Sequence, residues 1–236
     1  MQSTNQFSAG LDIFIAPSKA FAGLKEGKGW FLLPLVFVCG LIAASMYAYY
    51  SNVDTNFLIE QQVAQAGADL TTGEQKMMRN QMASTVDSQY LFAMIGGVIG
   101  LLIMNAIIAG YYTFVAKQDM TTDYKYGDWY SFSLWTLMPA GISAIGLIAL
   151  VATAQTDQLP LTMMSYASLN QLVFGLEAGQ PFATLLESLN IFSFWSIALA
   201  AIGLKTWTNF SMNKAIVFAA LPTVVIYVIW AIIAAL

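Results

Sequence analysis

The stretch Ala16–Pro34, APSKAFAGLKEGKGWFLLP, decides how this 236-residue chain is organised. A short helical segment that bears lysines is followed by Gly27-Lys28-Gly29, which favours a turn, and then Trp30 opens a long apolar run. No residue from 29 to 53 is charged, and about 20 apolar residues are enough to cross the roughly 30 Å hydrocarbon core of a bilayer. The sequence therefore predicts a first membrane span at about residues 30–50, and the lysines before it fix the direction of crossing.

The composition indicates that the bilayer is the solvent for most of the chain. Hydrophobic residues make up 58% and charged residues only 9%, whereas a soluble domain has about 25% charged residues. There is no histidine, no phosphate-binding loop and no basic patch suited to nucleic acid, and Cys39 is the only cysteine. We therefore expect a protein that is not an enzyme, with no catalytic residue, no cofactor, no metal site and no nucleic-acid partner.

Residues 7–26 predict two short helices at the membrane surface. Five apolar residues fall within an arc of roughly 120° on a helix, with charged residues to one side of it. The apolar residues are Phe7, Leu11, Phe14, Ile15 and Phe21, and the charged ones are Asp12, Lys19 and Glu26. Pro17 interrupts the period and suits the first turn of a second helix. We expect both helices to lie in the interface with their lysines toward lipid headgroups; the alternative is a pre-helix packed on the bundle.

A polar excursion at residues 51–90 follows the first span. It carries five acids and two bases, and its many glutamines, alanines and methionines favour helix. Gly67 and Gly73 suggest a break, and Thr71 and Glu74 have capping-box spacing. We predict one long helix from about Glu74 to about Ala116 that projects beyond the bilayer.

Four further spans are predicted at about residues 91–116, 131–153, 189–204 and 215–236. Asn105 lies in the middle of the second span and should face another helix, because an unsatisfied amide is costly there. Pro139 and Gly141 predict a kink in the third span. Residues 161–176 are interpreted as an interfacial or partly buried helix, with a re-entrant segment or a sixth span as alternatives.

Glycines spaced four apart in the second span, such as Gly96 and Gly100, let helices approach closely. This spacing allows a homo-oligomer, but packing within one chain is the favoured interpretation.

The distribution of lysine and arginine predicts the orientation. Cytoplasmic loops carry an excess of these residues, and with five spans seven of the nine bases fall on one side. They are Lys19, Lys25, Lys28, Lys117, Lys125, Lys205 and Lys214. The N-terminus is therefore expected inside and the C-terminus outside, with residues 51–90 as an outside loop; a sixth span would spoil this pattern.

Several stretches resemble the bacterial members of the Yip domain family, which are five-spanning membrane proteins related to Ypt/Rab-interacting proteins. The opening stretches are Pro17-Ser18-Lys19-Ala20-Phe21, Gly29-Trp30 and Leu33-Pro34-Leu35. The later ones are residues 127–137 leading to Pro139, Leu189-Asn190-Ile191-Phe192, Phe194-Trp195, Gly203-Leu204 and Lys214-Ala215. The resemblance implies no catalytic residue. It implies a non-enzymatic role and, for some bacterial members, association with ABC-type exporters; the Rab-binding motif of eukaryotic members is not recognisable here.

The sequence thus predicts a single all-α domain over residues 1–236. It would be a polytopic integral membrane protein of five transmembrane helices, with N-terminal interfacial helices and an extramembrane helical excursion. We expect a scaffold or accessory subunit of a membrane transport or envelope/trafficking complex in the bacterial inner membrane. Its expected partners are the lipid bilayer and other membrane proteins such as ABC exporter subunits. The alternative is a permease or channel for a small or lipidic substrate. Candidate partner or polar-packing positions are Pro17, Phe21, Trp30, Asn105, Pro139, Asn190 and Trp195.

Overall fold

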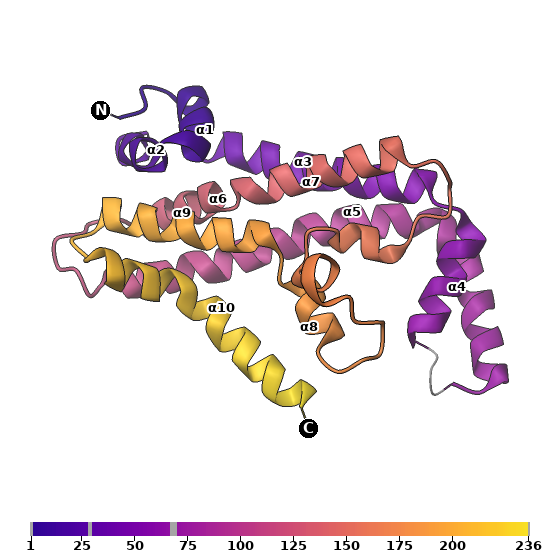
Figure 1. Ribbon diagram of the computed structural model, residues 1–236. Helices are drawn as coiled ribbons and strands as arrows, with labels where there is room; N and C mark the ends of the chain where they lie inside the picture. The colour runs from indigo at the N-terminus through magenta and orange to yellow at the C-terminus, as the bar shows by residue number, and fades with distance from the viewer. Residues whose placement is uncertain (1, 28–29, 67–69, 236) are drawn as a thin grey trace. The chain divides into compact units, whose positions relative to one another are not determined.

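The computed structural model describes residues 2–27, 30–66 and 70–235, and these residues form helices joined by loops (Figure 1). Within these ranges the only β-type pairing is one isolated bridge between Ser168 and Asn190. The helices are α1 (Gln6–Ile15), α2 (Pro17–Leu24), α3 (Leu32–Asn52), α4 (Thr55–Ala66), α5 (Thr72–Ala116), α6 (Tyr126–Thr136), α7 (Met138–Thr153), α8 (Ala183–Ser188), α9 (Ile191–Trp207) and α10 (Met212–Ala234). The predicted all-α class is confirmed.

Four helical segments are long and apolar enough to cross a membrane. They are Leu32–Asn52, Ser88–Ala116, Tyr126–Thr153, which comprises α6 and α7, and Met212–Ala234. Helix α9 is also apolar but has only 17 residues. The chain is therefore a polytopic membrane protein, and the count of five spans stays a prediction that depends on α9.

The chain divides into two compact units. Unit 1 comprises residues 1–41, 99–142 and 192–229, and unit 2 comprises residues 42–98, 143–191 and 230–236. Each unit is described by itself below, and the single domain over residues 1–236 stays a prediction.

Two prolines end helices in unit 1 as the sequence indicates. Pro17 is the first residue of α2, where its missing N–H does no harm, and α1 ends at Ile15 just before it. Helix α6 ends at Thr136 and α7 begins at Met138, so the predicted kink appears as a break immediately before Pro139. Gly141 has a packing role, because a Cβ at this position would overlap the ring of Phe37.

Unit 2 holds an apolar core and a pair of helices, α4 and the first part of α5, whose extramembrane position stays a prediction. The core consists of Tyr49, Val53, Leu58, Leu147, Val151 and Leu159. Helix α4 lies beside the first part of α5 (Figure 1), where Arg79 donates two hydrogen bonds of 2.7 and 2.9 Å to Glu60. The long helix predicted from about Glu74 to about Ala116 is present: α5 runs without a break from Thr72 to Ala116.

The capping box at the start of α5 is confirmed. The backbone N–H of Thr71 donates to a carboxylate oxygen of Glu74 at 2.8 Å, and the N–H of Glu74 donates back to the Thr71 hydroxyl at 3.4 Å. Gly73 lies inside the first turn of α5, so it is not a break. Gly67 lies outside the described residues, as do Lys28 and Gly29 of the predicted turn before the first span.

The single helix expected at residues 161–176 is wrong. The segment forms a 3₁₀ turn, Leu161–Ser165, and a short π-helical turn, Asn170–Phe174, and neither is long enough for a span. Gly175 ends the second turn with φ of +63°, a left-handed conformation that suits glycine. The Asn170 side chain then bonds both the N–H and the C=O of Leu176, at 2.8 and 2.9 Å, which closes the loop and stops helix growth.

Packing within the chain at Gly96 and Gly100 is also not found among the described residues. No atom outside the local helix lies within 4 Å of where a Cβ would stand on either glycine. Homo-oligomerisation through this surface stays a prediction.

Candidate functional site

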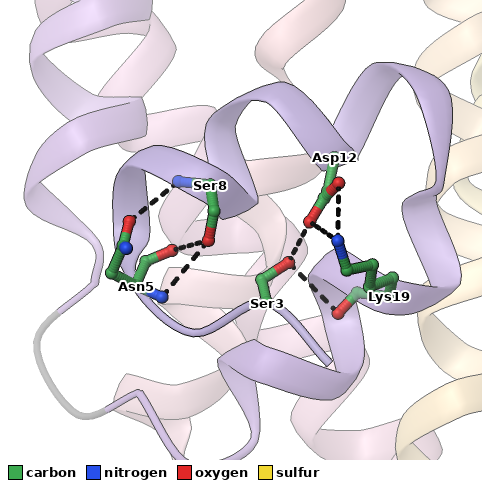
Figure 2. A network of polar contacts seen from close by, with 5 residues as sticks. All are labelled: Ser3, Asn5, Ser8, Asp12 and Lys19. Atoms are coloured by element: carbon green, nitrogen blue, oxygen red, sulfur yellow. Dashed lines mark hydrogen bonds and ion pairs between the residues drawn. The ribbon is translucent and has the colours of Figure 1, made fainter. Parts of the chain in front are cut away.

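The N-terminal helix pair, α1 and α2, is held by a small polar network in unit 1 (Figure 2). Asn5 caps α1: its side-chain oxygen accepts the N–H of Ser8 at 2.9 Å, and the Ser8 hydroxyl accepts the N–H of Asn5 at 3.3 Å. Such a reciprocal cap satisfies two backbone donors that the first turn of a helix leaves open. The helix start is therefore fixed by local sequence alone.

Asp12 and Lys19 join the two helices. The Ser3 hydroxyl donates to the Asp12 carboxylate at 2.7 Å, and the Lys19 ammonium lies 3.0 Å from it (Figure 2). The Ser3 bond, and then the Lys19 bond, lower the pKa of Asp12 below its usual value. Asp12 is 93% buried, so a carboxylate expected at the membrane surface is turned inward instead. Lys19 pairs with Asp12 while 40% of its side chain stays exposed, and its expected position toward lipid headgroups stays a prediction.

The apolar face of α1 points away from the rest of the chain. Phe7, Leu11 and Ile15 succeed one another every four residues and are 72%, 72% and 81% exposed. Phe14 instead packs edge-to-face on Trp195 of α9, with ring centroids 5.6 Å apart. Helix α1 thus buries Ala9, Asp12 and Ile13 and exposes large apolar side chains, an arrangement that suits a lipid environment and not water.

Phe21 anchors α2 in an aromatic cluster that we define as Phe21, Tyr112, Tyr124, Trp129, Phe132 and Trp207. Phe21 is fully buried, its ring lies 5.1 Å from that of Phe132, and its carbonyl accepts the Trp207 indole N–H at 2.9 Å. A Cβ at Gly203 would come within 2.5 Å of Phe132 and 2.8 Å of Phe21. The absence of a side chain at Gly203 therefore lets α2 and α6 meet α9 closely.

Trp30, just before α3, and Asn105, in α5, each form a hydrogen bond with helix α6 of unit 1. The Trp30 carbonyl accepts the indole N–H of Trp135 in α6 at 2.9 Å. Asn105 is 2% exposed, and its amide N–H donates to the Tyr130 carbonyl, also in α6, at 3.3 Å, while its side-chain oxygen has no partner among the described residues. Both residues thus hold helices together; whether either has a further role stays a prediction.

The other candidate positions lie apart. Pro17 and Pro139 shape the backbone of unit 1, and Trp195 contacts α1, whereas Asn190 belongs to unit 2, where its backbone forms the bridge to Ser168. The path lined by Asn105, Pro139 and Asn190 stays a prediction, because these residues belong to two units that are each described by themselves. The sequence stretches that resemble the Yip family include Gly203, Trp129 and Trp135, but sequence reasoning assigned no packing role to them or to Trp207. The last is a tryptophan at the end of an apolar helix, a position typical of the aromatic belt.

The described residues contain no group of three or more Asp, Glu and Cys side chains that could hold a metal ion. What the site does have is a set of indole, amide and phenol donors that bond backbone carbonyls of neighbouring helices. Together the helices and this site define an all-α polytopic membrane protein with an internally anchored N-terminal helix pair.

A comparison with known protein families shows to which family of membrane proteins this chain belongs. The Yip1 domain family model matches residues 11–233, nearly the whole chain, and the protein belongs to this family. Neither the curated proteins nor the solved structures contain a match. The expected resemblance to the Yip family is thereby confirmed.

Proposed function

We propose that this protein is a non-enzymatic scaffold or accessory subunit of a transport or envelope/trafficking complex in the bacterial inner membrane. Membership of the Yip1 domain family supports a membrane protein of the Yip/Rab-interacting type. Candidate partners are other membrane proteins, among them ABC exporter subunits, as the family resemblance implies.

One observation carries the proposal: the polar side chains of unit 1 that lie near the apolar helices are used to hold those helices. Trp135, Trp207, Asn105 and Tyr111 each donate to a backbone carbonyl of a different segment, over 2.8 to 3.3 Å. A side chain that binds a backbone carbonyl of its own chain stabilises the fold and is not left for a substrate. These four donors are therefore used for holding the helices, and we look to the surface of the protein for its partner contacts.

The extramembrane helix pair of α4 and residues 72–87 of α5 is the surface we expect partner proteins to contact. Its two helices are held in register by the Arg79–Glu60 pair and by a 3.0 Å bond from Gln89 to Gln62. Met77 projects from it with 73% of its surface exposed. A rigid helix face with an exposed methionine suits adaptable contacts to a protein partner.

Purification in a gentle detergent, followed by mass spectrometry of the proteins and lipids retained, tests this role. The Met77→Glu variant should lose a retained protein, whereas Met120→Glu, at a 98% exposed methionine of unit 1, should keep it. Equal retention by both variants would contradict this surface. A lone monomer with no bound protein or lipid would overturn the scaffold role.

The proposed orientation places the N-terminus inside and the C-terminus outside. It is supported by bonds among the lysine-rich segments: Asn209 N–H donates to Asp119 at 2.7 Å, and Trp207 donates to Phe21. A reporter that is active only in the cytoplasm, fused after residue 236, should be silent. Strong activity would refute both the five spans and the orientation.

Asn105→Leu separates the scaffold from a permease. The scaffold role requires that the folded variant still retain its partner, with lower stability because the bond to Tyr130 is gone. Loss of substrate flux in a folded variant that retains its partner would favour the permease instead.

A further inference from the structure

A polar pocket of about 540 Å³ lies in unit 1, where three segments far apart in sequence meet. Lys25 comes from the turn after α2, Asp119 and Asp123 from the loop after α5, and Lys205 from the last turn of α9. These are the three lysine-bearing segments that the charge pattern assigns to one side of the membrane. The volume falls within the range of about 300–1,000 Å³ that small-molecule sites have.

The pocket lies at the level where apolar helices end. Helix α5 ends at Ala116 and α9 at Trp207, and both are followed by polar loops. Tyr124 and Trp207 line the pocket with their rings 4.7 Å apart, and these residue types concentrate at the boundary between hydrocarbon and water. A ligand in this pocket would therefore have its polar part among the loops and room for an apolar part beside the helices.

The charged groups of the pocket are not equally available to a ligand. Asp119 already accepts the N–H of Asn209 at 2.7 Å and both the N–H and the hydroxyl of Thr121, at 3.1 and 2.8 Å. These bonds, with the Asn209 N–H first, lower the pKa of Asp119 and make it a structural carboxylate. It holds the loop after α5 against the end of α9.

Three other charges have no such partner. Within residues 2–27, 30–66 and 70–235, neither Lys25 nor Lys205 has a carboxylate within 4 Å, and Asp123 has no ion pair. With Asp119 included, the two lysines and two aspartates sum to zero charge. A ligand that itself carries one negative and one positive group keeps this balance, whereas a ligand with a single negative charge would leave the occupied pocket with a net charge of −1.

We propose that this pocket binds the headgroup of a phospholipid that carries both a phosphodiester and a primary ammonium group. The phosphate lies with Lys25 and Lys205, because charge-assisted bonds from ammonium groups to phosphate are among the strongest available at a membrane surface. The ligand ammonium lies with Asp123, and the acyl chains follow the apolar helices. This binding site goes beyond the scaffold role and does not depend on the identity of a protein partner.

Lipid binding to the full-length protein in detergent, measured by native mass spectrometry, tests the proposal. The lipids are phosphatidylethanolamine, which has both groups, and phosphatidylglycerol, which lacks the ammonium. The wild type should prefer phosphatidylethanolamine by about tenfold, because one charged hydrogen bond contributes at least that factor. Equal binding of the two lipids by the wild type would overturn the proposal.

Variants separate the two ends of the headgroup. Lys25→Gln combined with Lys205→Gln should weaken binding of both lipids by about tenfold or more, because the phosphate contacts are lost. Asp123→Asn should remove the preference for phosphatidylethanolamine. It should not weaken phosphatidylglycerol binding, because the change removes a negative charge that repels an anionic lipid. Lys117→Gln is the matched control, since this exposed lysine lies before the same loop and does not line the pocket. Unchanged binding in the double variant would overturn the proposal.

Folding and the source of the phosphate ester need their own controls. Circular dichroism and size-exclusion elution should be the same for all variants, and a variant that fails this check is replaced by Lys25→Met with Lys205→Met. Glycerophosphoethanolamine, the headgroup without acyl chains, should compete at least tenfold more weakly than the lipid, because it lacks the apolar part. Equal competition would assign the pocket to a water-soluble ester and overturn the lipid assignment.

Discussion

Replacing Phe21 with alanine tests whether the aromatic cluster anchors the N-terminal helix pair. The side chain is fully buried, with its ring 5.1 Å from Phe132 and against the bare backbone of Gly203. Removing a buried phenylalanine costs about 3–5 kcal/mol, and close helix packing around Gly203 leaves little freedom to fill the cavity. Taking about 3 kcal/mol, at roughly 1.4 kcal/mol per factor of ten, local opening of α2 becomes about a hundredfold more frequent.

Amide hydrogen exchange followed by mass spectrometry measures this opening directly. Peptides that cover residues 17–24 should exchange up to about a hundredfold faster in Phe21→Ala, while peptides from the apolar core of unit 2 stay unchanged. Phe114→Ala is the matched control, because this phenylalanine is 69% exposed and should leave α2 exchange as it is. The reasoning is refuted if α2 exchange is unaffected by Phe21→Ala, or if the control accelerates it equally.

Three further predictions concern polar contacts and helix approach, all measured as thermal unfolding in detergent. Asp12→Asn should lower the melting temperature at pH 6. Because the pKa of Asp12 is lower in the folded protein, its carboxylate stabilises the fold at pH values above its ordinary pKa near 4, and this contribution is lost as the pH falls through the native pKa. The difference in melting temperature between the wild type and the variant should therefore shrink as the pH falls below the ordinary value and through the native pKa, and a difference that stays constant during acidification would contradict the ion pair. Tyr49→Phe should cost about 1 kcal/mol, because its hydroxyl donates 3.0 Å to a backbone carbonyl in the core of unit 2. The hydroxyl of Tyr47 forms no hydrogen bond among the described residues, and this side chain is 55% exposed, so Tyr47→Phe should cost nothing measurable. Equal losses in the two variants would contradict a contribution of the Tyr49 hydrogen bond. Gly141→Ala should destabilise the protein by about 1–3 kcal/mol, because the added methyl group would overlap the ring of Phe37. Gly40→Ala is the control: it has open space around it and should be neutral or stabilising by up to about 1 kcal/mol. A larger loss of stability in Gly40→Ala than in Gly141→Ala would refute the close approach at Gly141.

Features of the fold that depend on local chemistry were predictable from the sequence. Pro17 and Pro139 lack a backbone donor, so each suits the first turn of a helix, and each lies there in α2 and α7. The reciprocal bonds of Thr71 and Glu74 need only a spacing of three residues. Long uncharged runs predict the apolar helices because their length matches the bilayer.

Features that depend on partners distant in sequence were not predictable. Phe7 lies in the apolar arc of α1 and Asp12 lies to one side of it, and the pattern alone does not say which side faces the rest of the chain. The inward direction of Asp12 is set by Ser3 and Lys19, and that of Phe14 by Trp195. In residues 161–176 the composition favours helix, but the Asn170 side chain forms hydrogen bonds with the backbone of Leu176 and the helical turn ends there.

The candidate site divides in the same way. The sequence indicated Phe21 and Trp30 as candidate positions because of their side chains. In the structure their backbone carbonyls also hold neighbouring segments, since each accepts an indole N–H group. No pattern of residue types reports which carbonyl a tryptophan will reach, because the donors lie 105 and 186 residues away in sequence.

The unbroken helix α5 has a consequence for how the extramembrane helix pair and the span of the same helix are linked. Each residue of an α-helix advances 1.5 Å and turns 100°, so the 16 residues from Thr72 to Asp87 extend about 24 Å before the apolar segment that starts at Ser88. Deleting one residue between Arg79 and Ser88 would therefore rotate the Glu60-binding side by about 100° relative to the span. The number of residues between Arg79 and Ser88 therefore sets two things. It sets the distance along α5 between the α4 contact and the span, and it sets the direction around the helix axis in which that contact faces.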